Sequence, residues 1–207
     1  SDSRVPLEEL LEVFPGGFNA IFNIVERRST IESLLQTMVA DLPPNENVVI
    51  EDREIPGPED APPVGVRIYR PKAASGVLPG IFFIHGGGMI MGSVEGENLK
   101  ATELCEAIQA VVVSVEYRLA PEHPHPAPVQ DCYAALKWMA KNADDLAFDP
   151  NRLAVVGGSA GGGLTIATTM MARDKGFPRI CFQMPLYPMI DDRNETPSSY
   201  EIMDVGI

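Results

Sequence analysis

The segment that most constrains this chain runs from residue 153 to residue 161. The apolar run 153–156 (LAVV) predicts a buried strand, and residues 157–161 (GGSAG) follow it directly, before a stretch with helical character. This is the G-x-S-x-G pattern in the strand–turn–helix context of a nucleophile elbow. The glycines allow a sharp, strained turn. We therefore expect the Ser159 hydroxyl to project from the carboxyl end of a strand, at a helix N-terminus that favours negative charge.

A second motif follows another predicted strand, residues 81–84 (IFFI). His85 comes next, and after it three successive glycines, Gly86, Gly87 and Gly88. Glycines leave backbone N–H groups uncovered, and such donors stabilise the oxyanion that develops on a carbonyl under attack. A flexible surface loop is the alternative interpretation. The strand directly before the glycines and the elbow later in the chain favour an oxyanion hole.

Together with residues 117–124 (YRLAPEHP), these motifs resemble the hormone-sensitive-lipase-like branch of the α/β-hydrolases, the bacterial family IV esterases. The resemblance extends from about Val48 to Asp192. It implies an α/β fold, with a mostly parallel sheet, helices on both of its faces and an N-terminal helical cap. Gly158 is a mild departure, since the family more often has an acidic or small polar residue before the nucleophile.

The resemblance also implies roles for single residues. Ser159 would be the nucleophile, and the N–H groups of Gly87, Gly88 and Ala160 would form the oxyanion hole. The structural positions beside the site would be those of His85, Gly86, Gly157 and Gly161. No metal and no cofactor is implied.

The resemblance does not extend to the whole catalytic triad of the family. In the family the chain order is serine, then aspartate or glutamate, then histidine. The three histidines of this chain, His85, His123 and His125, all precede Ser159. The resemblance therefore implies that the triad acid and histidine are not in this chain, that the last strands of the sheet are missing, and that residues 1–207 alone are inactive.

The function implied is carboxylic-ester hydrolysis through a serine acyl-enzyme, on short- to medium-chain esters. Two alternatives stay open: a ligand-binding receptor of the same fold without catalysis, similar to the plant gibberellin receptors, and an amidase or thioesterase. The implied partner is a small-molecule ester, and a homodimer is the further assembly considered.

Composition excludes several other classes. The net charge of −13 disfavours nucleic acid and anionic membrane surfaces as partners. Three widely spaced cysteines, Cys105, Cys132 and Cys181, indicate reduced thiols and a cytoplasmic location. No apolar run is long enough for a membrane span. Residues 157–163 do not form a phosphate loop, because they lack both the middle glycine and the lysine that such loops need.

Periodicity predicts helices in the first part of the chain and alternating strands and helices after it. The resemblance implies that these are N-terminal cap helices over residues 1–45 and an α/β-hydrolase core over residues 46–207. The apolar spacing in the first region indicates helices broken at residues 15–17, which form either a plain packing layer or a cap over the active site. The apolar positions are Phe18, Ile21, Phe22, Val25, Ile31, Leu34, Leu35 and Met38. In the core we predict strands at 48–55, 64–69, 81–84, 111–115, 153–156 and 180–186, helices at 97–109, 129–141 and 160–173, and a turn at 149–151.

Three further groups of residues are candidates. Glu116, Arg118 and Glu122 form either an ion network that braces the elbow or a solvated charge cluster. His123 and His125, interleaved with prolines, are interpreted as surface loop histidines rather than metal ligands. The residues after the glycines offer flexible apolar surface for an acyl or alcohol pocket: Met89, Ile90 and Met91.

Overall fold

A six-stranded sheet is the centre of the molecule. The computed structural model describes residues 8, 11–12, 17, 20–40, 42–43, 45–59 and 61–201. The strands lie in the order β1-β2-β4-β3-β5-β6. β1 and β2 pair antiparallel with each other, β2 pairs antiparallel with β4, and the remaining neighbours are parallel. The predicted α/β fold with a mostly parallel sheet is confirmed. The strand bounds are Val48–Ile55 (β1), Val64–Pro71 (β2), Leu78–Ile84 (β3), Val111–Glu116 (β4), Phe148–Gly158 (β5) and Phe182–Leu186 (β6).

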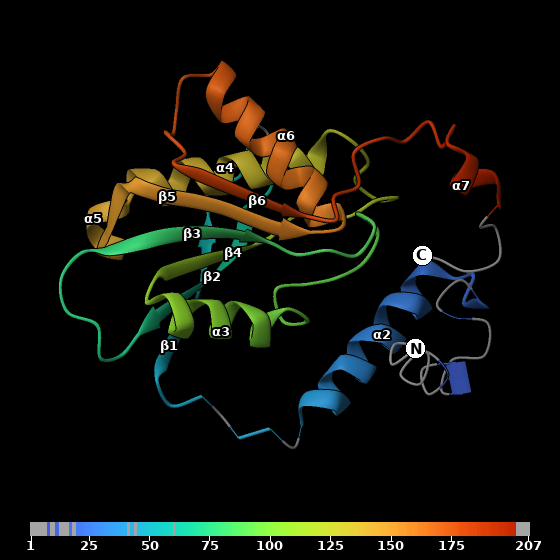
Figure 1. Cartoon of the computed structure of the whole chain (residues 1–207), viewed down its shortest axis with the longest axis horizontal. Helices are drawn as coiled ribbons and strands as arrows, with labels where there is room; N and C mark the ends of the chain where they lie inside the picture. Colours follow the sequence, from blue (N-terminus) through green and yellow to red (C-terminus); the bar gives the residue numbers. More distant parts are fainter. Residues whose placement is uncertain are drawn as a thin grey trace.

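Helices cover both faces of this sheet, as Figure 1 shows. α4 and α6 lie on one face and α3 lies on the other. The helix bounds are Ile24–Val39 (α2), Asn98–Ile108 (α3), Ala127–Lys141 (α4), Ala143–Leu146 (α5), Ala160–Asp174 (α6) and Pro197–Glu201 (α7). The short helices α5 and α7 were not predicted, because four or five residues carry too little periodicity to detect.

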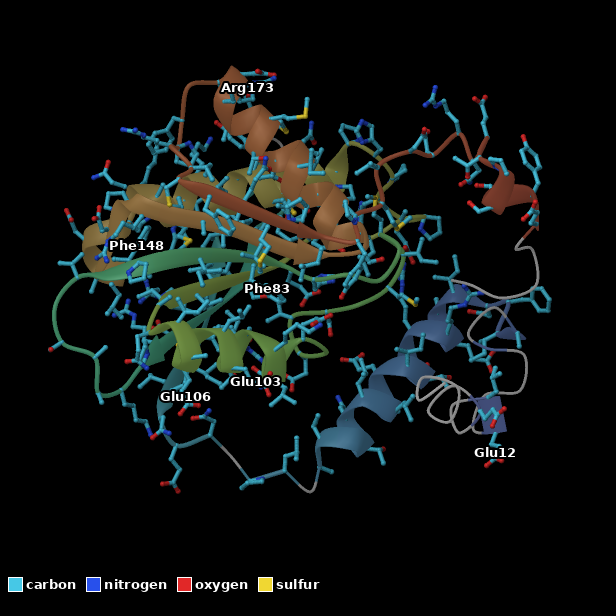
Figure 2. The ribbon with its side chains drawn as sticks, in the orientation of Figure 1. Glu12, Phe83, Glu103, Glu106, Phe148 and Arg173 are labelled. Atoms are coloured by element: carbon cyan, nitrogen blue, oxygen red, sulfur yellow. The ribbon has the colours of Figure 1, made fainter. Side chains whose placement is uncertain are left out.

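Alternation along the central strands divides the apolar residues between two cores. On β3, Phe82 and Ile84 join the larger core, under α4 and α6. Ile81 and Phe83 point to the smaller core, where they meet Ala101 and Cys105 of α3; Phe83 is labelled in Figure 2. Strands buried on both faces need apolar residues at nearly every position, which is why these runs were recognisable in the sequence.

The predicted turn at residues 149–151 does not precede the strand but lies within it, and there Asp149 Oδ1 accepts a hydrogen bond from Asn151 N at 2.9 Å. These residues belong to β5, which begins at Phe148. Phe148 is 2% exposed and pairs with Leu78, and the register shifts between Leu78 and Gly80. Its ring fills the space over Gly80, where an added methyl group would lie 2.5 Å from Phe148 Cδ2. Burial of this ring extends the strand through a sequence that locally favours a turn.

Helix α2 is less buried than its sequence predicts. It begins at Ile24, with Asn23 as N-cap: the Asn23 side chain accepts hydrogen bonds from the backbone N–H groups of the next turn. Phe22 and Val25 were expected on the apolar face but are 91% and 65% exposed. Pro15, Gly16 and Phe18, with most of the chain before residue 20, lie outside the described residues, so the division of the chain at residue 45 stays a prediction.

Candidate active site

Ser159 lies at the sharp turn between β5 and α6. Its backbone has φ 56° and ψ −119°, which is a strained conformation for a residue with a side chain. Three backbone hydrogen bonds hold it there: Ser159 N donates to Leu186 O, and Ser159 O accepts from Gly163 N and Met189 N, each at 3.0 Å. The end of β6 and the segment after it therefore fix the turn. This is the backbone geometry that the G-x-S-x-G pattern predicts.

Close approach to β3 explains why glycine is needed two residues after the serine. A methyl group added to Gly161 would lie 2.2 Å from Ile84 O and 2.5 Å from His85 O. Any side chain there would push the first turn of α6 away from the end of β3. Gly157, on the other side of the elbow, has the same constraint, because an added methyl group would lie 2.4 Å from Gly161 O.

The glycine loop after β3 reaches the elbow. A methyl group added to Gly86 would lie 3.1 Å from Gly158 O and 3.6 Å from Ser159 Cβ. Gly87 has φ +114° and Gly88 has φ +62°. Gly87 O accepts hydrogen bonds from Ile90 N at 3.1 Å and Met91 N at 3.0 Å. The structure thus brings together two motifs that are more than seventy residues apart in the sequence.

Ala160 is the first residue of α6 and is fully buried. The N–H groups of the first turn of a helix have no partner within the helix, and they carry the positive end of its dipole. The Ala160 N–H is therefore a donor next to the Ser159 hydroxyl. The carboxyl ends of β3 and β5 thus bring together a serine hydroxyl, a helix N-terminus and a glycine loop, which is an arrangement suited to acyl transfer.

His85 is fully buried beneath this loop. Its Nδ1 lies 2.8 Å from Gly86 O. A carbonyl oxygen only accepts, so Nδ1 carries the proton and donates. Burial lowers the pKa of His85 to about 4, so the ring is neutral at neutral pH. Its Nε2 has no hydrogen-bond partner among the described residues, and Glu116 Oε1 is 3.9 Å away.

Of the two interpretations of Glu116, Arg118 and Glu122, a shared ion network or a solvated charge cluster, the shared network is wrong, because the three residues have three separate partners. Arg118 binds the fully buried carboxylate of Asp131 with its side chain, at 2.8 Å to each oxygen. Glu116 accepts a hydrogen bond from Val94 N at 2.8 Å. Glu122 pairs with Arg28 of α2. The sequence analysis missed Asp131, although an aspartate within the apolar pattern of a helix is a signal for a buried ion pair.

Arg28 of α2 is a second residue that the sequence analysis missed. Its Nη1 and Nη2 donate to the two carboxylate oxygens of Glu122, at 2.9 and 2.8 Å. These hydrogen bonds lower the pKa of Glu122 to about 2. The same guanidinium also donates to the carbonyl oxygens of Ile90, at 2.5 Å, and Ala120, at 2.7 Å. No signal in the sequence identifies these partners.

His123 and His125 are exposed, as predicted. No cluster of three or more histidine, cysteine, aspartate or glutamate side chains suited to a metal ion occurs within the described part of the chain. Of the three cysteines, Cys105 and Cys132 are buried and Cys181 is exposed, and all three are free thiols. Within that part of the chain, the helices are all too short or too polar to cross a membrane.

An apolar cavity of about 330 Å³ opens one helical turn from Ser159. Gly163, Ala167 and Met170 line it from the side of α6 that also carries Ser159, since residues three or four apart share a helix face. Met89 lines it from the glycine loop, whereas Ile90 and Met91 do not. The other lining residues are Ala120, His125, Pro128, Val129, Leu164, Ile166, Met189 and Ile190.

A larger hollow of about 670 Å³ lies elsewhere, between the C-terminal half of α6 and the start of β6. Arg173, labelled in Figure 2, is one of its lining residues and marks the end of α6 that is remote from Ser159. Because this hollow is remote from the elbow and from the glycine loop, the smaller cavity is the better candidate for a substrate site.

Comparison with known proteins places this arrangement in a family. Residues 81–205 match a family model described as alpha/beta hydrolase fold. The matched segment includes the glycine loop, residues 117–124 and the elbow. The chain belongs to this family of α/β-hydrolases, as the resemblance to the hormone-sensitive-lipase-like esterases predicts.

Several of the named relatives are esterases. Carboxylesterase NlhH of Mycobacterium tuberculosis is 38% identical over 201 residues, which are 97% of this chain and 61% of that protein. A solved bacterial heroin esterase superposes with a TM-score of 0.82 at 39% identity, over 86% of this chain and 56% of the other. The esterase of the archaeon Pyrobaculum calidifontis gives a TM-score of 0.72 at 42% identity, over 81% and 52%. This chain thus spans about half to three fifths of the length of these proteins.

Proposed function

We propose that the protein is a carboxylic-ester hydrolase that acts through an acyl-enzyme on Ser159. The single observation that carries this proposal is the contact between the two motifs: an added methyl group on Gly86 would lie 3.6 Å from Ser159 Cβ. Oxyanion donors act only within hydrogen-bond distance of the oxygen on the carbon under attack, so a loop that supplies them has to lie beside the nucleophile. The relatives named carboxylesterase and esterase support the same chemistry.

The proposed reaction has two halves. Ser159 Oγ attacks the ester carbonyl carbon while a general base takes its proton and then passes it to the leaving alkoxide. The developing oxyanion accepts hydrogen bonds from the N–H groups of Gly87, Gly88 and Ala160. The tetrahedral intermediate collapses to an acyl-serine and an alcohol, and water then releases the acid. The strained backbone at Ser159 supports this assignment, since such strain is characteristic of functional turns.

The general base is not assigned to any histidine of this chain. The Nδ1 proton of His85 is donated to Gly86 O and its ring is buried beneath the loop. His123 and His125 are exposed in the proline-rich segment. We propose that His85, Gly86, Gly157 and Gly161 are structural members of the site and that the apolar cavity beside Gly163 accepts the acyl or alcohol group of the ester.

Covalent labelling tests the proposal. The whole protein should hydrolyse p-nitrophenyl butyrate and should be labelled at Ser159 by an aryl phosphonate, as located by peptide mass spectrometry. Ser159→Ala should abolish both, and Ser198→Ala, at an exposed position in α7, should change neither. Labelling at another residue would contradict the assignment. Tight binding of esters without turnover or labelling would instead favour the receptor alternative. Faster turnover of matched amides or thioesters than of esters would favour an amidase or a thioesterase.

A further inference from the structure

Arg28 of helix α2 makes hydrogen bonds to the segments that follow the glycine loop and β4. None of the described side chains of α2 is fully buried. Leu35 approaches the segment before α3, since its Cδ1 would lie 3.3 Å from a methyl group added to Gly96. In Figure 1 the helix lies outside the layers of sheet and helices, near the loops at the carboxyl ends of the strands. The hydrogen bonds of Arg28 are therefore the contacts that can fix α2 against those loops.

The Arg28 side chain joins three partners that come from two loops. Nε donates to Ile90 O at 2.5 Å, and Nη2 donates to Ala120 O at 2.7 Å. Nη1 and Nη2 also form the bidentate pair with Glu122. Only a planar guanidinium provides this fork of donors; a lysine ammonium is a point charge and cannot replace it. Arg28 is 24% exposed at its side chain, so these bonds are partly shielded from water.

These bonds reach the proposed oxyanion hole through very few atoms. The peptide that carries Ile90 O also carries Met91 N, which donates to Gly87 O at 3.0 Å, so the peptide that Arg28 binds belongs to the same tight turn as Gly87. The second loop is tied to the first, because Ala120 N donates to Met89 O at 2.9 Å. A side chain that holds both Ile90 O and Ala120 O therefore restrains the turn from two directions.

We propose that Arg28 is a positioning residue for the oxyanion hole: from helix α2 it holds the turn of residues 87–90, so that the Gly87 and Gly88 N–H groups face the oxyanion. It does not touch the reacting atoms. This inference rests on the proposed esterase function. It links the N-terminal helix to catalytic rate rather than only to coverage of the site, since small displacements of oxyanion donors cost rate steeply.

The test compares Arg28→Ala with two matched variants in the whole protein. Gln36→Ala changes another exposed residue of α2, and Glu122→Gln removes the charge of the partner while leaving Arg28 free to bind both carbonyl oxygens. We expect Arg28→Ala to lower kcat for p-nitrophenyl butyrate at least tenfold per phosphonate-titrated site, with KM changed less than threefold. Gln36→Ala should be within twofold of the unsubstituted protein, and Glu122→Gln should lose less than Arg28→Ala. Arg28→Lys should not restore the rate.

A second readout separates this proposal from the esterase assignment. Amide hydrogen exchange of residues 86–91 should become at least tenfold faster in Arg28→Ala, and exchange in β4 should not change. If the unsubstituted protein hydrolyses no ester, the esterase function fails and exchange alone decides the positioning role. A purely structural role would lower the fraction of active sites without changing kcat per site. Unchanged kcat per site, or unchanged exchange at the loop, would overturn the proposal. If Arg28→Ala does not fold, the same measurements on Arg28→Lys decide it.

Discussion

The rings of His85 and Tyr117 stack beneath the proposed oxyanion loop, with centroids 4.1 Å apart and planes at 11°. The Tyr117 hydroxyl also donates to His85 O at 3.0 Å. The two residues directly follow neighbouring strands, β3 and β4. Burial raises the pKa of the Tyr117 phenol, so it stays a protonated donor at neutral pH. The stacked pair thus supports the backbone at His85, from which the glycine loop begins.

Tyr117→Phe tests the contribution of that hydroxyl. The change keeps the stacked ring but leaves the buried His85 carbonyl without its donor, so we expect the free energy of unfolding to fall by about 1–3 kcal/mol. Tyr133→Phe is the matched control, because the Tyr133 hydroxyl donates to Phe177 O at an exposed position. Tyr133→Phe should lower the free energy of unfolding by less than half as much as Tyr117→Phe. Urea unfolding of both variants measures the difference, and equal losses would show that burial of the bond is unimportant.

The buried imidazole predicts a dependence of stability on pH. His85 has its pKa lowered to about 4 by burial, whereas an unfolded histidine titrates near 6.5. Between these values the unfolded chain binds more protons than the folded protein, so stability falls as pH falls. From pH 6.5 to pH 5, above the range where most carboxylates titrate, the loss due to this group should be about 1.5 kcal/mol. In His85→Asn this slope should disappear; if it persists, another group causes it.

Much of the architecture could be predicted from the sequence because burial leaves a local pattern. β1 was predicted with its observed bounds, and the core strands were found because residues buried on two faces are apolar at nearly every position. The elbow and the glycine loop were found because close backbone contacts admit only glycine, as at Gly161. In each case the physical constraint acts on residues that are adjacent in the chain.

The predictions that were wrong or missing concern contacts between residues that are far apart in the chain. Residues 149–151 favour a turn locally, but the distant pairing of Phe148 with Leu78 keeps them in a strand. Arg28 binds Ile90 and Glu122, which are 62 and 94 residues away, and nothing near Arg28 in the sequence distinguishes it from any surface arginine of a helix. Glu122 was grouped with its sequence neighbours for the same reason. Ion pairs depend on which segments the fold brings together.

Asp131 provides a stability prediction for one such pair. Its carboxylate is fully buried and accepts hydrogen bonds from Arg118 N, Nε and Nη2. Asp131→Ala would leave the partly buried guanidinium without its partner, so we expect a loss of about 3–5 kcal/mol, as for other broken buried pairs. Asp174→Ala breaks the exposed pair with Arg173 and should change the free energy of unfolding little, because water screens that pair. Thermal unfolding of both variants measures the two losses of stability. If the loss in Asp131→Ala is as small as that in Asp174→Ala, the buried pair contributes little.

The glycine loop allows the cost of backbone strain to be separated from the cost of collision. Gly87 and Gly76 both have positive φ, at +114° and +86°. A methyl group added to Gly87 would lie 2.1 Å from Met91 O, whereas one added to Gly76 meets nothing within 4 Å. Gly76→Ala therefore introduces strain alone, and Gly87→Ala introduces strain and a backbone collision within the turn that carries the proposed oxyanion donors.

Because of that collision, Gly87→Ala must displace the turn. Loss of one oxyanion donor typically lowers kcat by about 10²–10³-fold, so we expect Gly87→Ala to lose rate in that range, with KM nearly unchanged. Gly76→Ala should lose stability, by on the order of 1 kcal/mol for a strained φ, and should keep its full kcat. Steady-state kinetics with p-nitrophenyl butyrate, normalised to phosphonate-titrated sites, separates the two effects. Full activity of Gly87→Ala would show that the loop only connects β3 to the following segment and that the oxyanion donors lie elsewhere.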